Sequence, residues 1–87
     1  MAKIVLVDDE LTMVQMIAEV LRGEGHEVYP FTSPSGVPEV LVERQPDLVI
    51  TDLYLDKTKP HGMEIIRKAR ALNPPAVVIM VTGFGTV

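Results

Sequence analysis

Short runs rich in β-branched residues alternate along this chain with longer segments of helical periodicity. The runs cover residues 4–7, 28–31, 48–51 and 77–81, and they are apolar almost throughout. Such runs are typical of strands buried in a sheet, although Pro30 marks its own run as an edge strand because proline has no N–H to donate. The alternation predicts an α/β domain with a parallel sheet in the order β-α-β-α-β-α-β, since right-handed crossovers connect such strands.

The segments between the runs carry helix signals of different strength. Residues 11–22 place apolar side chains at helical spacing and are followed by glycines, which commonly end a helix. We expect the second helix over residues 37–44, because Pro38 would remove a hydrogen bond from a helix that began at Pro34. The third helix is indicated by apolar residues at helical spacing: Met63, Ile66, Ala69 and Leu72.

Polar side chains stand where three of the predicted strands end. Asp8 and Asp9 follow the first strand, Asp52 the third and Thr82 the fourth. In an open parallel sheet, ligands bind at the carboxyl ends of the strands where the strand order reverses, so we expect these groups to converge. Gathered carboxylates repel by about 4 kcal/mol per pair at a surface-like dielectric, so a cation or a proton must resolve the cluster. The alternative is that these acids are solvated loop residues.

The donor set predicts the chemistry of this edge. Oxygen ligands suit a hard divalent cation such as Mg²⁺, which commonly takes one or two carboxylates. An aspartate carboxylate can also attack phosphorus and form an acyl phosphate. Asp52 is the candidate nucleophile because we expect its strand to be central, and the Thr82 hydroxyl could donate a hydrogen bond to a phosphoryl oxygen.

Composition excludes several function classes. The 87 residues include 12 acidic and 8 basic side chains, which give a net charge of −4, and no cysteine. The acidic balance argues against electrostatic binding of nucleic acid, and the lack of cysteine excludes disulfides and thiolate metal sites. The longest apolar run, residues 76–81, is far shorter than the ~20 residues of a membrane span. We expect one cytoplasmic domain over residues 1–87, bound neither to nucleic acid nor to a membrane.

Three motifs in order resemble the receiver domain of bacterial response regulators. They are Asp8-Asp9 after the first strand, the run P-D-L-V-I-T-D that ends at Asp52, and V-T-G-F-G at residues 81–85. The resemblance covers the whole chain, and the ordered set is more specific than any one motif. It implies a flavodoxin-like, doubly wound parallel sheet, here with four strands and three helices.

The resemblance also implies roles for individual residues. Asp52 would accept a phosphoryl group from a sensor histidine kinase and hydrolyse it slowly, so the chain would be a signalling domain rather than an enzyme of metabolism. Thr82, followed by Gly83, would be the switch hydroxyl that binds the phosphoryl group. The implied Mg²⁺ ligands are Asp8, Asp9, Asp52 and the backbone carbonyl of Tyr54.

The sequence departs from the family pattern in two places. The loop after the phosphoacceptor looks about two residues longer than usual, and Lys57 or Lys59 could reach the pocket. The chain also stops where the fourth helix of the family would begin. We therefore expect the fourth helix, the fifth strand with its phosphoryl-binding lysine and the fifth helix to be missing. An alternative function follows, in which the chain is an incomplete receiver that cannot be phosphorylated and serves as an interaction module.

Two apolar surfaces suggest a partner. On the first helix, Met13, Met16 and Val20 extend the apolar face beyond what one sheet can cover, and residues 77–81 would form an exposed hydrophobic edge. We expect self-association through residues 77–81 or by exchange of elements. The longer parent protein would carry a DNA-binding or other output domain.

A second alternative function is that of a magnesium-dependent phosphohydrolase with an aspartate nucleophile. Enzymes that resemble the haloacid dehalogenase family carry D-x-D at the end of the first strand, whereas Asp8 and Asp9 are adjacent. The chain also has no room for the cap domain of such enzymes. The sequence favours the phosphoacceptor over the hydrolase.

Overall fold

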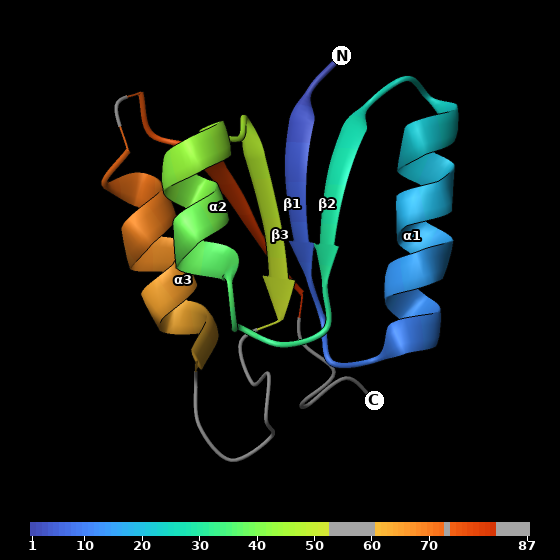
Figure 1. The fold of residues 1–87 in the computed structure, drawn as a ribbon, viewed down its shortest axis with the longest axis horizontal. Helices are drawn as coiled ribbons and strands as arrows, with labels where there is room; N and C mark the ends of the chain where they lie inside the picture. The colour runs from blue at the N-terminus through green and yellow to red at the C-terminus, as the bar shows by residue number, and fades with distance from the viewer. Residues whose placement is uncertain (53–60, 73, 82–87) are drawn as a thin grey trace.

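In the part of the chain that the structure describes, seven elements follow one another in the predicted alternation (Figure 1). The computed structural model describes residues 1–52, 61–72 and 74–81. The second helix and the fourth strand have the predicted bounds, and the other elements differ from prediction by one or two residues at an end. The elements are β1 (Lys3–Val7), α1 (Leu11–Gly23), β2 (Glu27–Phe31), α2 (Val37–Arg44), β3 (Leu48–Asp52), α3 (His61–Arg70) and β4 (Val77–Val81).

All strand pairs in the sheet are parallel, in the order β2-β1-β3-β4. The chain leaves β1 to form β2 on one side, then crosses back and forms β3 on the other side of β1. The strand order therefore reverses between β1 and β3, which is the position where ligands bind in open α/β sheets. As the sequence predicts, β2 is an edge strand and β3 lies inside the sheet.

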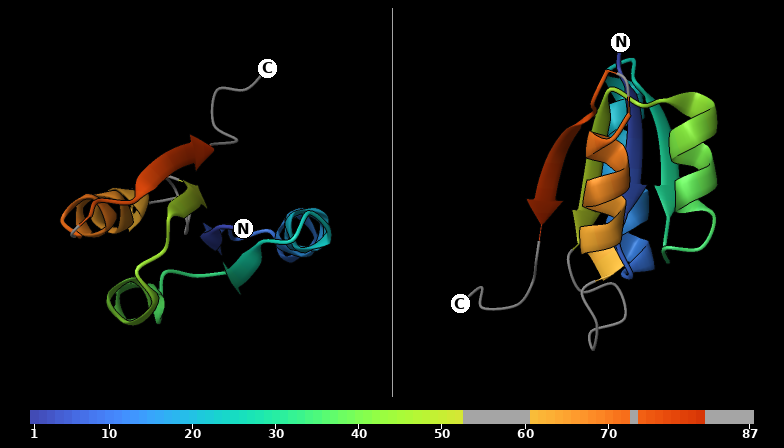
Figure 2. Two further views of the ribbon diagram at one scale, coloured as in Figure 1. Left: turned by 90° about the horizontal axis from the view of Figure 1, so that it is seen from above. Right: turned by 90° about the vertical axis from the view of Figure 1, so that its left-hand side faces the viewer.

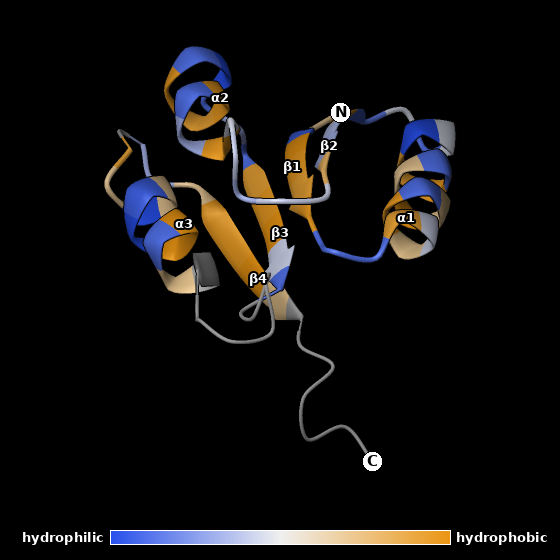
Figure 3. Ribbon diagram, turned by 60° about the horizontal axis from the view of Figure 1, so that its bottom comes forward, coloured by the Kyte–Doolittle hydropathy of each residue, from blue (hydrophilic) through white to orange (hydrophobic). Residues whose placement is uncertain are grey.

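Helices cover both faces of the sheet, so the doubly wound architecture is confirmed (Figure 2). On one face, α2 and α3 pack over buried β1 and β3 side chains that include Val5, Val7 and Val49. On the other face, α1 packs over Leu6 and Val28. Strands β1, β3 and β4 are hydrophobic along most of their length, whereas the helices alternate between apolar and polar stripes (Figure 3).

Asp47 fixes where β1, β3 and β4 begin. Its carboxylate Oδ2 accepts the backbone N–H of Lys3 at 2.9 Å. Its own N–H donates to the carbonyl of Lys3 at 2.8 Å, and its carbonyl accepts the N–H of Val77 at 3.0 Å. A slip of one residue would move every side chain of a strand to the opposite face, so these bonds help to hold the register on which the core depends.

The buried stripe of α3 differs from the predicted one. Ile65 and Ala69 are the buried residues, at 3% and 0% exposed, whereas Met63 and Ile66 are only half-buried. The difference arises because α3 packs against α2 as well as against β3 and β4, so its apolar contact is wider than a single i, i+3 stripe.

The apolar excess of α1 is exposed, as expected. Met13, Met16 and Val20 are 43%, 56% and 63% exposed, because α1 lies mainly over β2 and β1 and leaves the β3–β4 end of that face open (Figure 2). None of the described helices is long and apolar enough to cross a membrane.

Adjacent residues of α2 provide a test of the core. Leu41 is fully buried between α2 and the sheet, whereas Val42 is 57% exposed. We expect Leu41→Ala to lower the free energy of unfolding by about 2 to 5 kcal/mol, because it leaves a cavity in a small core. Val42→Ala should change it by no more than about 0.5 kcal/mol. Urea unfolding followed by circular dichroism measures both, and equal effects would contradict the assignment of this helix face.

Candidate metal and phosphoryl site

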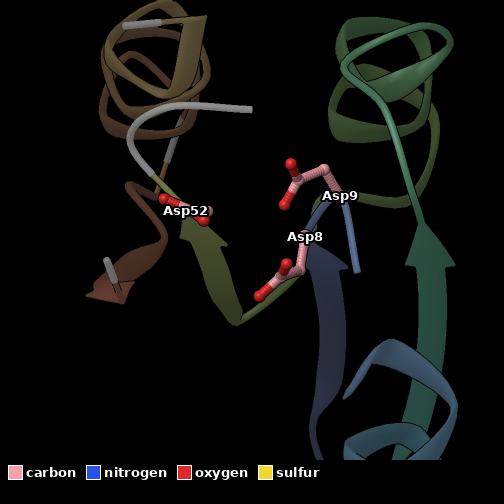
Figure 4. A group of neighbouring side chains, drawn as sticks. All are labelled: Asp8, Asp9 and Asp52. Carbon is pink, nitrogen blue, oxygen red and sulfur yellow. The ribbon is translucent and has the colours of Figure 1, made fainter. Parts of the chain in front are cut away.

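Three carboxylates meet at the point where the strand order reverses. Val7 of β1 is level with Thr51 of β3, so Asp8 and Asp52, each one residue further on, end their strands side by side. Asp9 follows directly, and each of the three acids offers an oxygen within 4.8 Å of those of the others (Figure 4). All three side chains are half-buried. The predicted convergence of these acids is therefore present in the structure.

Backbone hydrogen bonds around Asp8 turn the chain from strand into helix. The Asp8 N–H donates to the carbonyl of Phe31 at 3.1 Å, which ties the end of β1 to β2. Its carboxylate Oδ1 accepts the N–H of Glu10 at 2.9 Å, and the Glu10 carbonyl accepts the N–H of Val14 at 3.0 Å in the first turn of α1. Asp8 thus has a structural bond that also orients its carboxylate.

Thr51 is a supporting residue that sequence reasoning missed. It is 0% exposed, and its hydroxyl Oγ1 donates to the backbone carbonyl of Asp52 at 3.0 Å. The bond satisfies a buried hydroxyl and steadies the peptide that carries Asp52. The sequence does carry a signal for this role. Thr51 is a polar residue in an otherwise apolar run, and the alternation of side chains along a strand places it on the same face as the buried Val49.

The surroundings of Asp8 disfavour its ionised form. Burial raises the pKa of Asp8 above its ordinary value of 3.8, the hydrogen bond from the Glu10 N–H lowers it in part, and the negative charges of Asp52 and Asp9 raise it further. A positive charge placed among these oxygens would offset both the burial and the repulsion.

The donor set fits a hard divalent cation. The oxygens are carboxylates of mutually repelling groups, and their spacing allows each to reach one ion. Magnesium commonly binds one or two carboxylates and keeps water in its remaining positions, which half-buried side chains permit. Asp8, Asp9 and Asp52 are therefore the residues that could hold Mg²⁺.

Other predicted site residues lie outside the described part of the chain. These are Tyr54 with its carbonyl, Thr82 and Gly83 of the predicted switch, and Lys57 and Lys59 of the long loop. Their roles stay predictions.

The sequence matches the model of the response regulator receiver domain over residues 4–87. The match covers nearly the whole chain and agrees with the sheet order and the acidic cluster. The chain belongs to the response regulator receiver family. This match confirms the family that the three motifs led us to expect. Receivers are signalling domains of two-component systems.

Relatives of this receiver include both long and short proteins. NtrX of Azorhizobium caulinodans, a nitrogen assimilation regulatory protein, is 26% identical over 84 residues, which cover 97% of this chain and 18% of NtrX. The response regulator receiver protein CpdR of Brucella abortus is 28% identical over 87 residues, which cover 100% of this chain and 71% of CpdR. The chain therefore spans less than a fifth of one relative and most of the other.

A solved structure supports the same fold. The crystal structure of a response regulator receiver domain protein from Clostridium thermocellum superposes on this receiver with a TM-score of 0.81 at 36% sequence identity. The superposition covers 98% of this chain and 68% of that one. The flavodoxin-like fold that the sequence implied is thus shared with a known receiver.

The raised pKa of Asp8 predicts how the receiver's stability depends on pH when no divalent cation is present. Above pH 3.8 an unfolded Asp8 loses its proton while the folded one still holds it, so the free energy of unfolding falls as pH rises through this window. Asp8→Asn removes that loss and keeps an oxygen to accept the Glu10 N–H. We expect the variant to be the more stable protein at pH 7 and to lose this advantage below pH 3.8.

Chemical denaturation at several pH values in a chelating buffer measures the effect. Added Mg²⁺ should stabilise the parent and stabilise Asp8→Asn much less, because the variant has lost a ligand. A variant less stable than the parent at neutral pH without metal would contradict the argument that burial and the neighbouring charges disfavour the ionised Asp8 carboxylate.

Proposed function

We propose that this receiver accepts a phosphoryl group on Asp52, with Asp8 and Asp9 as its acidic partners. The observation that carries the proposal is the position of Asp52, which ends an interior strand beside the switch point and has the other two carboxylates within 4.8 Å. A nucleophile at the centre of the strand edge can be approached by a phosphoryl donor from outside the sheet.

The reaction is a transfer from a donor histidine to an aspartate. A carboxylate oxygen of Asp52 attacks phosphorus, so a P–O bond forms while the P–N bond to the donor breaks. The imidazole ring of the donor histidine keeps the electron pair of the broken bond and takes up a proton. The product is an acyl phosphate on Asp52, which water later hydrolyses to phosphate and the free carboxylate. Slow hydrolysis of this kind is self-dephosphorylation and not turnover of a metabolite.

The acidic partners have to be neutralised before a phosphoryl group can approach. Bound Mg²⁺ would supply that positive charge and a Lewis acid for the phosphoryl oxygens. The residues that would hold it are Asp8, Asp9, Asp52 and the carbonyl of Tyr54. The bond from the Glu10 N–H keeps Asp8 turned toward the cluster, and the Thr51 hydroxyl holds the Asp52 peptide in place.

Partners follow from the chemistry and from the family. The proposed donor is a sensor histidine kinase, and the proposed readout is a movement of Thr82 with Gly83 toward the phosphoryl group. A DNA-binding or other output domain in a longer parent, and a place in the cytoplasm, belong to the same proposal. Two further points also stay predictions. One is that a single domain covers residues 1–87, and the other is that the chain associates with itself through residues 77–81.

Phosphorylation by a small-molecule donor tests the central assignment. Incubation with acetyl phosphate and Mg²⁺ should add one phosphoryl group, seen by intact-mass spectrometry and mapped to Asp52 in tryptic peptides. We expect Asp52→Asn to reduce the modification at least tenfold, because the amide is a poor nucleophile. Omission of Mg²⁺ should reduce it as strongly.

Asp47→Asn is the matched control, since Asp47 precedes the opposite end of the same strand and its replacement keeps an oxygen for the Lys3 N–H. Modification that persists in Asp52→Asn would overturn the assignment. Continuous release of phosphate from many esters would favour the phosphohydrolase. A lack of response to both acetyl phosphate and beryllofluoride would favour the interaction module.

A further inference from the structure

Thr51 carries the only buried polar side chain among the described residues. It is 0% exposed, and the alternation of side chains along β3 places it on the same face of the sheet as Val49, where α2 and α3 cover the core. Val5 and Val7 of β1 are buried on this face as well. Valine, which has the shape of threonine without the hydroxyl, is the ordinary choice for such a position in a strand.

Packing alone gives no reason for a hydroxyl at this position. Burying a hydroxyl costs free energy, and one hydrogen bond does little more than offset that cost. The Thr51 Oγ1 donates its bond to the backbone carbonyl of Asp52, at 3.0 Å. That bond is only partly buried, so water can replace the donor if the hydroxyl is removed. The hydroxyl therefore acts on Asp52 more than on the core.

The position of this bond explains what it adds to the sheet. The pairing of β1 with β3 ends at Val7 and Thr51, and the next N–H of β1, that of Asp8, donates to β2. On its other side, Asp52 is level with Val81 of β4. The Asp52 carbonyl thus lies beyond the last paired residues of β1 and β3, where the Thr51 hydroxyl supplies a donor.

Holding this carbonyl aims the Asp52 carboxylate. The Asp52 Cα lies between two planar peptide groups, so fixing both planes fixes the direction in which the side chain leaves the backbone. The direction needs support because the carboxylates of Asp8 and Asp9, whose oxygens lie within 4.8 Å, repel that of Asp52. In a group transfer, a displacement of about 1 Å can lower the rate about a hundredfold.

We propose that the Thr51 hydroxyl is a positioning group for phosphoryl transfer, which keeps the Asp52 carboxylate in line with the incoming phosphoryl donor. Successive side chains of a strand point to opposite faces, so Thr51 contacts neither the donor nor the ion and acts through the backbone of Asp52. The inference rests on the proposed function, since it concerns the rate at which Asp52 reacts.

Two conservative replacements separate positioning from packing. Thr51→Val keeps the branched shape and removes the hydroxyl, whereas Thr51→Ser keeps the hydroxyl and removes a buried methyl group. A residue that only packs would make the serine variant the damaged one, both in stability and in rate. A residue that positions Asp52 gives the opposite order of rates, so the two measurements diverge.

Urea unfolding measures stability, and intact-mass spectrometry measures the initial rate of phosphorylation by acetyl phosphate over a range of Mg²⁺ concentrations. We expect Thr51→Val to unfold at the same urea concentration as the parent or a higher one. Its maximal rate should be lower by about fivefold or more, with the half-saturating Mg²⁺ concentration unchanged. Thr51→Ser should unfold at a lower urea concentration and keep a maximal rate within about twofold of the parent's.

Other outcomes overturn the proposal in distinguishable ways. Equal rates in the parent and Thr51→Val, or a slower rate in Thr51→Ser than in Thr51→Val, would leave packing as the role of Thr51. A Thr51→Val protein less stable than Thr51→Ser would show that the core itself requires the hydroxyl. A loss of rate that disappears at saturating Mg²⁺ would assign the effect to ion binding.

The parent protein separates this proposal from the function on which it rests. A parent that acetyl phosphate does not modify at Asp52 overturns the phosphoacceptor function, and the role of Thr51 falls with it. A parent that is modified at Asp52, beside a Thr51→Val protein that reacts equally fast, overturns the role of Thr51 alone.

Discussion

The parallel pairing of β1 with β3 is the constraint on which the rest of this receiver depends. It brings residues more than forty positions apart in the sequence level with each other, with Val7 opposite Thr51. The same pairing creates the switch point, because β2 lies on the far side of β1. Asp47 holds the start of these strands, and the acidic cluster forms at their end. Register at one end of the sheet therefore decides the geometry at the other.

The cluster opposes the fold that builds it. Burial raises the pKa of Asp8, and the negative charges of Asp52 and Asp9 raise it further. This cost falls on a chain that buries only about 60 to 65% of its unfolded surface. Strand β1 is buried from Ile4 to Val7, and the burial of these apolar side chains offsets part of that cost. A ligand of opposite charge turns the repulsion into binding affinity, so site and stability are coupled through the same three side chains.

Much of this arrangement could be predicted from the sequence. The alternation of runs and helices determines the element order, Pro30 identifies an edge strand, and the acids at strand ends indicate the site. Contacts that depend on three-dimensional neighbours could not be predicted. The buried stripe of α3 moved to Ile65 because α2 packs beside it, and the Thr51 hydroxyl gained its role only from the local backbone at Asp52. Periodicity reports which side of an element is apolar, whereas packing against two neighbours decides which residues are covered.

The edge strand β2 has a consequence for how this chain behaves when it is crowded. Pro30 has no N–H to offer to a neighbouring strand, and Arg22 Nη2 already donates to the Val28 carbonyl at 3.0 Å. A strand that added to this edge would have to displace the Arg22 side chain and would still lack a donor at Pro30. The β2 side of the sheet is therefore a poor template for aggregation, although the strand itself carries few charges.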